Sequence, residues 1–430
     1  MRRAALALAF GLCAVAASAE TVVLRGATVH PVSGPDLPRA TIVLQDGRIL
    51  SLGASMAEPA GAKVVDLAGK HVYPSLFPPA TVLGLAEISA VRATVDTTEL
   101  GEINPQARAD FAMNFDSELL PVARSGGVLI AGIAPTGGIL SGSAAAMRLD
   151  GWTREDATLK APAAIVVTWP DLEIDRSPTA RFSVRLQEKR RDEAVRKLQE
   201  AFDAARAYGK ARAAEGSGGV PRHDADPRLE ALLPAIDGKI PVLVAANRVA
   251  QIRAALAWAK ESGVRIAILG GADAWRIAGD LAAARTPVIF DAALDLPLRS
   301  DEPYDTRFAG PGLLAKAGVS VAFNEGTNPF DAALVRNLPH QAAAAVAFGF
   351  PREKAVEAMT LEPARILGVA DRVGSIEPGK DATLIVTDGD ILDLRSHVVA
   401  AYLDGRALDL TDKQKRLYER YRNRPTPAAR

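Results

Sequence analysis

"IPVLVAANRVAQIRAALAWAKESGVRIAILGG", residues 240–271, alternates two kinds of apolar pattern. "IPVLVAAN" and "RIAILGG" are short apolar runs typical of buried strands, and residues 250–261 between them have the spacing of an amphipathic helix. A second helix is predicted over residues 272–285, followed by the strand "PVIFD". Apolar strands that alternate with helices indicate a parallel sheet covered on both faces.

The same alternation extends through the middle of the chain. "GVLIAGIAP" (127–135), "AAIVVTWP" (163–170) and "VSVAFNEG" (319–326) are predicted strands, and a helix is predicted over residues 341–348. Roughly 300 residues of this pattern favour an α/β fold, a (β/α)8 TIM-like barrel with insertions. A doubly wound open sheet is the alternative, but no G-x-G-x-x-G motif opens a first βα unit.

Strand-rich segments lie at both ends of the chain. "TVVLRGATVHP" (21–31) and "ATIVLQDGRILSLG" (40–53) begin it, and "SIEPGKDATLIVTDGDILD" (375–393) and "VVAAYLDGRAL" (398–408) return near its end. We expect one small β-sandwich domain formed by both termini, with two unrelated β appendages as the alternative. The expected divisions are sandwich residues 20–74 and 371–412, barrel residues 75–370 and a C-terminal tail, 413–430.

The first residues have the features of a secretory signal peptide. "MRRAALALAFGLCAVAASAE" contains two arginines, a short apolar run and the small residues Ala17-Ser18-Ala19, which predict cleavage after residue 19. The run is short for a membrane span, although an uncleaved anchor is the alternative. We therefore expect a secreted, periplasmic protein. The single cysteine, Cys13, lies in this segment, so the mature chain would have no thiol for a disulfide or a metal.

The charge balance argues against two classes of partner. The chain of 430 residues has 51 Lys and Arg against 51 Asp and Glu, so its formal net charge is zero. Nucleic acids and anionic membranes favour basic surfaces, so neither is expected as a partner. An unknown small molecule is expected instead.

Three motifs together resemble the amidohydrolase superfamily, in its imidazolonepropionase-like branch. They are "GKHVYPSL" (69–76), "AVEAMTLEPARILGVADRVGSIEPGKDATLIV" (355–386) and "YLDGRAL" (402–408). In the second motif the resemblance rests on Thr360, Pro363, Ala364, Leu367, Gly368, Gly374, Pro378, Gly379, Lys380 and Asp381. The resemblance covers nearly the whole mature chain and implies a barrel hydrolase that acts on non-peptide C–N bonds.

The resemblance also implies a metal centre whose ligands this chain lacks. The family holds one or two divalent ions, typically zinc, with histidines and an aspartate at the barrel mouth. The positions that match these ligands are Ala80, Val82, Ala245, Gly270 and Gly326, with Glu325 in place of Gly326 if the register differs by one. Aliphatic side chains and hydrogens donate no lone pairs. We therefore expect a degenerate metal centre, no metal and no other cofactor.

A replacement zinc site is not expected. The histidines are His30, His71, His223, His340 and His397, and none forms an H-x-H or H-x-x-x-H pair. Such a site would have to combine His223 and His340 with scattered carboxylates.

Polar residues at the ends of predicted strands and in the loop after the first one are the candidate site. The catalytic candidates are Glu325, Asn324 and His340, with Glu325 as the best acid or base. Candidates for substrate binding are Glu87, Arg92, Asn104, Thr168 and Asn247. The alternative for Glu325 is an ordinary strand-end carboxylate that pairs with Arg336 or contacts water.

Three functions remain open from the sequence. The chain is an amidohydrolase-fold hydrolase by resemblance, a small-molecule-binding or partner-subunit pseudoenzyme, or a metal-independent enzyme that uses Glu325. Residues 181–214 are strongly charged, with Val195, Leu198, Phe202 and Ala205 at helical spacing. A helix packed on the barrel exterior is the first interpretation, with a lid or a dimer contact as alternatives. A homodimer or a pairing with an intact paralogue is therefore a possible assembly.

Overall fold

The computed structural model describes residues 21–54, 56–215, 222 and 224–425. The predicted signal peptide, residues 1–19, lies outside the described residues, as does His223. Among the described residues, no helix is both long and apolar enough to cross a bilayer.

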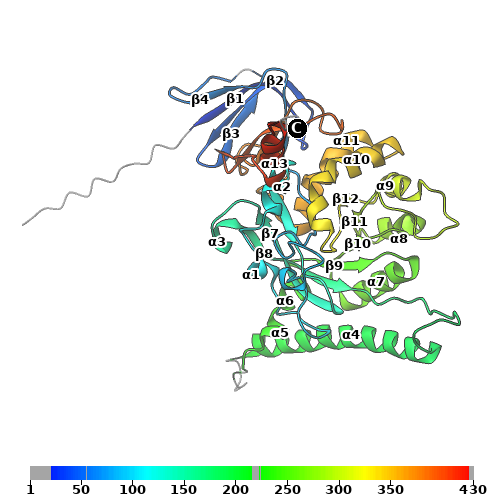
Figure 1. Cartoon of the computed structure of the whole chain (residues 1–430). Coiled ribbons are helices and arrows are strands. Elements are labelled where there is room, and N and C mark those ends of the chain that lie inside the picture. Colours follow the sequence, from blue (N-terminus) through cyan, green and yellow to red (C-terminus); the bar gives the residue numbers. More distant parts are fainter. Residues whose placement is uncertain (1–20, 55, 216–221, 223, 426–430) are drawn as a thin grey trace, which may run out of the picture.

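One sheet joins the two ends of the chain (Figure 1). Its strands run in the order β15-β14-β13-β5-β1-β2-β3, with β4 paired to β1. The strands are β1 (Val22–Val29), β2 (Leu37–Gln45), β3 (Arg48–Gly53), β4 (Lys63–Asp66), β5 (His71–Pro74), β13 (Leu384–Thr387), β14 (Val398–Leu403) and β15 (Arg406–Ala407). Because β5 pairs with both β1 and β13, the prediction of one domain built from both termini is confirmed. All of these strands belong to one hydrogen-bonded sheet, which encloses its own apolar core.

A second sheet of seven strands forms the barrel wall, in the order β12-β11-β10-β9-β8-β7-β6. Its strands are β6 (Ile130–Ile133), β7 (Leu140–Arg148), β8 (Thr158–Thr168), β9 (Val242–Ala246), β10 (Ile266–Gly270), β11 (Val288–Asp291) and β12 (Val321–Asn324). The pairs from β8 to β12 are parallel. The predicted fold class is confirmed: the chain has a mixed α/β fold with a curled barrel sheet and a separate sheet domain.

Strand β7 departs from the expected parallel pattern. It runs antiparallel to both β6 and β8. Residues 134–139 join β6 to β7, and this connection is too short for the crossover that a parallel pair needs.

The segment that follows β5 lies between the two edges of the barrel sheet. Leu76 and Thr81 form parallel bridges to Val128 and Ile133, beside and within β6. On the other side, the backbone N–H of Ala80 donates to Asn324 Oδ1 at the end of β12, 3.3 Å away. The segment that carries the first two expected metal positions therefore closes the gap between β6 and β12.

Helices and short helical turns connect the strands on the outside of the barrel (Figure 1). They are η1 (Arg92–Thr94), α1 (Ala109–Ala112), α2 (Leu119–Ser125), α3 (Arg154–Ala157), α4 (Val184–Ala214), α5 (Pro227–Glu230), α6 (Leu233–Ile236), α7 (Val249–Ser262), η2 (Ala274–Ile277), α8 (Ala278–Ala283), α9 (Thr306–Lys316), η3 (Asp331–Asn337), α10 (Leu338–Ala347), α11 (Arg352–Met359), α12 (Leu361–Leu367) and α13 (Lys413–Arg422). The helix predicted over 250–261 is α7, whereas the one predicted over 272–285 is divided into η2 and α8.

The long charged helix packs on the barrel exterior. In α4, Leu198, Phe202 and Ala205 are buried, as their spacing predicts. The ring of Phe202 contacts Trp258 of α7 edge to face, with centroids 5.0 Å apart. A lid or dimer role for α4 stays a prediction.

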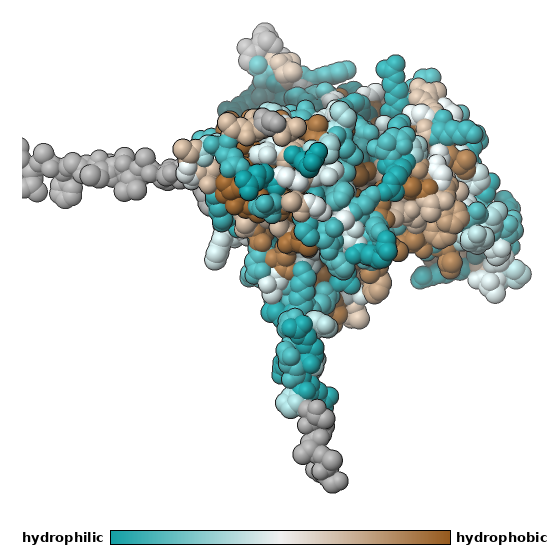
Figure 2. Space-filling view, turned by 90° about the horizontal axis from the view of Figure 1, so that it is seen from above, coloured by the Kyte–Doolittle hydropathy of each residue, from teal (hydrophilic) through white to brown (hydrophobic). Residues whose placement is uncertain are grey.

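The expected C-terminal tail contains helix α13. Every residue of this helix is exposed. Seen from above, it projects as a largely hydrophilic arm (Figure 2). Hydrogen bonds join it to the barrel domain, from Arg416 to the carboxylate of Glu118 and from Arg336 to Gln414.

Two apolar cores lie on the two faces of the barrel sheet, one inside the barrel and one outside it. The inner core is rich in small side chains, among them the alanines Ala80, Ala144, Ala267 and Ala322. A larger core lies between the sheet and the helices and includes Phe290 and Phe323. Because strand side chains alternate, Asp291 and Asn324 have the same orientation as the inner-core residues Ile289 and Ala322. Both therefore lie at the inner rim of the barrel.

Candidate functional site

The carboxyl ends of five parallel strands place several predicted residues at one edge of the sheet. Thr168 pairs with Ala245, Ala246 with Gly270, and Asp291 with Asn324. Thr168, Asn247, Asn324 and Glu325 therefore lie along the barrel mouth, as predicted from their positions after apolar runs. Asp291 belongs to the same edge and was missed. The sequence did indicate its place at the end of a strand, because Asp291 ends the apolar run "PVIFD".

A side-chain amide bridges the barrel mouth at Asn324. Its Nδ2 donates to Asp291 Oδ1 over 2.7 Å, and its Oδ1 accepts from the backbone N–H of Ala80. Asn324 is fully buried. Buried amides are stabilised when both ends have partners, so this bridge connects β11, β12 and the first barrel segment.

Glu325 follows Asn324 and is also buried, with 6% of its surface exposed. Gln341 Nε2 donates to its Oε2 over 2.6 Å. Burial raises the pKa of Glu325 to about 7, assisted by the negative charges of Asp331 and Asp291 and opposed by the Gln341 hydrogen bond. Glu325 is therefore able to exchange a proton near neutral pH.

Asp291 is the second carboxylate whose proton affinity is raised. Burial raises the pKa of Asp291 to about 6, opposed by the Asn324 hydrogen bond and by the charge of Arg307. The Arg307 guanidinium itself donates to the carbonyls of Asp291 and Ala292. The mouth therefore has two carboxylates with a raised pKa, Asp291 held by Asn324 and Glu325 held by Gln341.

The structure brings Gln341, and not His340, to the candidate site. His340 is exposed on α10. Gln341 is buried, and it accepts from the backbone N–H of Leu294 over 2.8 Å while it donates to Glu325. Gln341 was missed, although its helical spacing with the buried Leu338, Ala342 and Ala345 indicated an inward position.

Polar side chains from elsewhere fill the space beside two of the expected ligand positions. A Cβ on Gly326 (φ +134°) would lie 2.2 Å from Asp331 Oδ2. A Cβ on Gly270 (φ +96°) would lie 2.5 Å from Asn247 Oδ1. Larger side chains at either glycine would therefore displace these groups. Asp331, held by the backbone N–H and the side chain of Asn328, was missed because no local pattern indicates it.

The loop after the first barrel segment uses its polar residues for its own contacts. Asn104 is buried and donates to the carbonyl of Gly101, and Arg92 is exposed and donates to the carbonyl of Val95. Glu87 accepts from Asn114 over 3.5 Å. Thr168 and Asn247 have exposed side chains at the mouth. The substrate-binding roles of these five residues stay predictions.

The residues present do not fit the metal centre that the resemblance implies. Ala80 and Val82 are fully buried within apolar cores, and Ala245 packs against the inner core. Ala80, Val82, Ala245, Gly270 and Gly326 have no side-chain donor. Within the described part of the chain, no group of three or more His, Cys, Asp or Glu side chains is arranged to hold a metal ion.

Comparisons with known proteins show which proteins this chain is similar to. The model of the amidohydrolase family matches residues 244–411. A curated relative, the amidohydrolase tasK of Hapsidospora irregularis, is 24% identical over 374 residues. That match covers 81% of this chain and 37% of the relative, so the chain spans little more than a third of that protein's length.

Solved structures are similar to this chain over most of its length. An amidohydrolase from Thermotoga maritima MSB8 is 25% identical, with a TM-score of 0.78 over 90% of this chain and 99% of that one. An adenosine deaminase from Xanthomonas campestris with bound zinc is 16% identical, with a TM-score of 0.53 over 93% of this chain and 97% of that one. The second likeness concerns the fold alone. The family model, the relative and the first structure confirm the resemblance to the amidohydrolase superfamily.

Proposed function

We propose that this chain, an amidohydrolase-family hydrolase by family and fold, hydrolyses non-peptide C–N bonds with carboxylate acid–base chemistry and without the family's divalent ions. Glu325 acts as the general base, and Asp291 and Asn324 form the polar wall beside it. The observation that carries this proposal is the raised pKa of Glu325, about 7, in a buried position at the carboxyl ends of the strands.

The donor set supports the metal-free part of the proposal. The family chemistry needs imidazole and carboxylate ligands, and the matching positions are Ala80, Val82, Ala245, Gly270 and Gly326. The carboxylate of Asp331 occupies the space beside Gly326, and the amide of Asn247 occupies the space beside Gly270. A metal ion would therefore find filled space and no convergent donors.

The absence of a Lewis acid restricts the substrate class. A bound divalent ion contributes several kcal/mol of transition-state stabilisation in metal hydrolases. Without it, a single carboxylate base suits C–N bonds that are already activated, such as those of cyclic imides and ureides. Because Glu325 must be ionised to accept a proton from water, turnover should rise as the pH passes about 7.

The test compares two carboxylate variants of the full-length, chelator-treated protein on cyclic imides and ureides. Glu325→Gln should lower kcat/KM by about 100-fold or more and remove the rise near pH 7. Glu419→Gln, which removes an exposed carboxylate on α13, is the matched control and should leave both unchanged. Unchanged turnover in Glu325→Gln, or activity that appears only when zinc is added, would overturn the proposal.

A second candidate function is a binder that performs no reaction. The closure of the mouth favours it, because Asn324 is fully buried and Glu325 is held by Gln341. In that case the same compounds should bind to the wild-type protein without turnover, and Glu325→Gln should change affinity alone. Turnover by the wild-type protein would exclude this candidate.

A further inference from the structure

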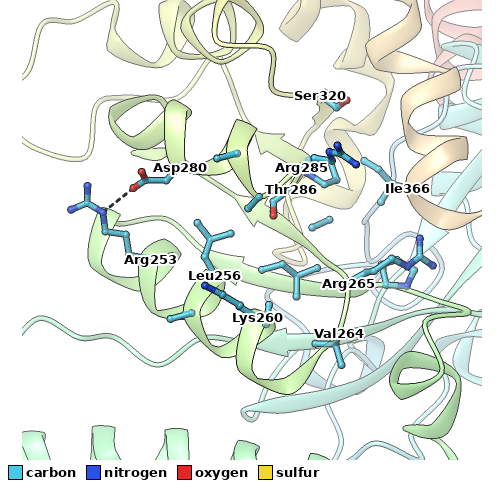
Figure 3. Close-up of a pocket in the computed structure, with 18 of the residues that line it drawn as sticks. Arg253, Leu256, Lys260, Val264, Arg265, Asp280, Arg285, Thr286, Ser320 and Ile366 are labelled. Atoms are coloured by element: carbon cyan, nitrogen blue, oxygen red, sulfur yellow. Dashed lines mark hydrogen bonds and ion pairs between the residues drawn. The ribbon is translucent and has the colours of Figure 1, made fainter.

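A cavity of about 930 Å³ lies at the opposite end of the barrel sheet from the carboxylates. It is bordered by α7, α8 and α12 and by residues just before β9, β10, β11 and β12, such as Pro241, Arg265, Pro287 and Ser320. Figure 3 shows Arg253 and Asp280 on one side of the cavity and Arg285 beside Thr286 on the other. The volume is within the range of small-molecule sites in proteins.

Positive charge dominates the lining of this cavity. Five of its side chains are cationic and two are carboxylates. Both carboxylates are already paired, Asp280 with Arg253 over 3.2 Å and Glu362 with Arg365. Lys260, Arg265 and Arg285 have no carboxylate partner among the described residues. The cavity therefore has an excess of positive charge that an anion would neutralise.

The positive charge of the lining also affects the pKa of a neighbouring lysine. Lys160 lies outside the lining and donates to the carbonyls of Leu367 and Gly368 at the end of α12. The pKa of Lys160 is lowered, first by burial and then by the charge of Arg265. Arg265 is itself fixed in position, because its Nη2 donates to the carbonyl of Gly238 over 2.6 Å.

Arg285 occupies a backbone position that favours glycine. Its φ is +52°, in the left-handed region, just after the end of α8. Glycine is the usual residue at this place after a helix, because a side chain there costs about 1 kcal/mol or more. The turn therefore does not explain why an arginine is at this position. Its side chain lines the cavity.

The remaining lining is mainly aliphatic. Leu256 and Val264 come from α7 and the residues after it, Ile266 from β10 and Ile366 from α12. The hydroxyl of Thr286, a buried residue beside Arg285, adds a hydrogen-bond donor. Apolar walls with a few cations at the rim suit a ligand that has an apolar body and an anionic end.

We propose that this cavity binds an organic monocarboxylate with an aliphatic body, its carboxylate held by Arg285 and its chain against Leu256, Val264 and Ile366, while Lys260 adds positive charge to the lining. The site is separate from the barrel mouth and does not depend on the proposed hydrolase function. Arg265 contributes charge from its fixed position.

The experiment is calorimetric titration of the full-length protein with decanoate below its micelle concentration. Decanoate should bind at one saturable site, and its affinity should fall as sodium chloride rises, because salt screens exposed charges. Decan-1-ol, which has the same chain without the charge, and inorganic phosphate, which has charge without the chain, should each bind at least about tenfold more weakly.

Two variants locate the site and two serve as controls. Arg285→Gly should keep the fold, because glycine suits its backbone, and should weaken decanoate binding by about tenfold. Lys260→Gln should weaken it in the same direction. Arg395→Gln removes an equally charged but remote and exposed group and should leave the affinity unchanged. Glu325→Gln should also bind decanoate normally, because it alters the mouth.

Several results would overturn the proposal. They are the absence of saturable decanoate binding, equal affinity for decan-1-ol or for phosphate, and unchanged affinity in both Arg285→Gly and Lys260→Gln.

Discussion

The two ends of the barrel sheet differ in charge, in closure and in what their side chains bind. At the carboxyl ends of β11 and β12, Asp291 and Glu325 are carboxylates held by neighbouring amides. At the amino ends of β10 and β11, Arg265 and Arg285 border an open cavity of about 930 Å³. Strand β11 has both kinds of group, with Asp291 as its last residue and Arg285 shortly before its first.

The two ends also differ in how much space their side chains leave. The mouth is closed by hydrogen bonds between side chains, and the space beside its glycines is filled by Asp331 and Asn247. The other end keeps free volume and cations without carboxylate partners among the described residues. A larger side chain at the closed end should therefore destabilise the fold, whereas removing a side chain at the open end should change the stability little.

The largest expected effect comes from returning a family ligand to the mouth. Ala80→His inserts an imidazole where Ala80 is fully buried in the inner core. Overpacking and an unpaired buried ring should together lower the free energy of unfolding by about 4 kcal/mol, measured by urea denaturation. Added zinc should not restore the lost stability. A stable variant that gains zinc affinity would show that the mouth is an open metal site.

The next effect concerns the charge on Glu325. Its pKa in the folded chain is about 7, above its ordinary value of 4.5, so protonation of Glu325 stabilises the fold. This stabilisation is complete below about pH 4.5 and is lost as the pH rises through 7. Glu325→Gln removes the buried charge and should raise the free energy of unfolding at pH 8 by about 3 kcal/mol, with little change at pH 4.5. Equal effects at both pH values would contradict the raised pKa.

A smaller loss is expected when the amide bridge is removed. Asn324→Ala leaves Asp291 and the N–H of Ala80 without their partner, which should cost about 2 kcal/mol at pH 8. Because Asp291 is largely protonated below its pKa of about 6, the cost at pH 5 should be smaller. Thermal unfolding at the two pH values measures the loss of stability. A loss that does not depend on pH would show that Asn324 does not stabilise the charged form of Asp291.

The smallest effect is expected at the open end. Arg285→Gly removes a whole side chain but relieves a left-handed backbone, while glycine adds freedom to the unfolded chain. The free energy of unfolding should therefore change by less than about 1 kcal/mol. A loss as large as that of Asn324→Ala would mean that Arg285 supports the fold and that this end is not open.

The sequence predicted the elements that have a strong local pattern. The spacing of Leu198, Phe202 and Ala205 located α4, and the apolar run before Asn324 located β12 and the residues that follow it. It did not predict strand β7 or its antiparallel direction. That direction depends on a short connection.

At the site, the sequence supplied candidates but not their partners. Glu325 and Asn324 were predicted from their place after a strand, whereas their bonds to Gln341, Asp291 and Ala80 depend on contacts between distant segments. Asp331 beside Gly326 is such a case, because no residue type or spacing indicates that its carboxylate fills that space. Buried partners of this kind are set by tertiary packing.

Metal analysis of the purified full-length protein tests the proposed metal-free mouth most directly. After dialysis against a metal-free buffer, plasma mass spectrometry should find less than about a tenth of an equivalent of zinc, iron, nickel or manganese, because the matching positions offer no convergent donors. Half an equivalent or more of one ion, retained by the wild-type protein and lost in Glu325→Gln, would contradict it.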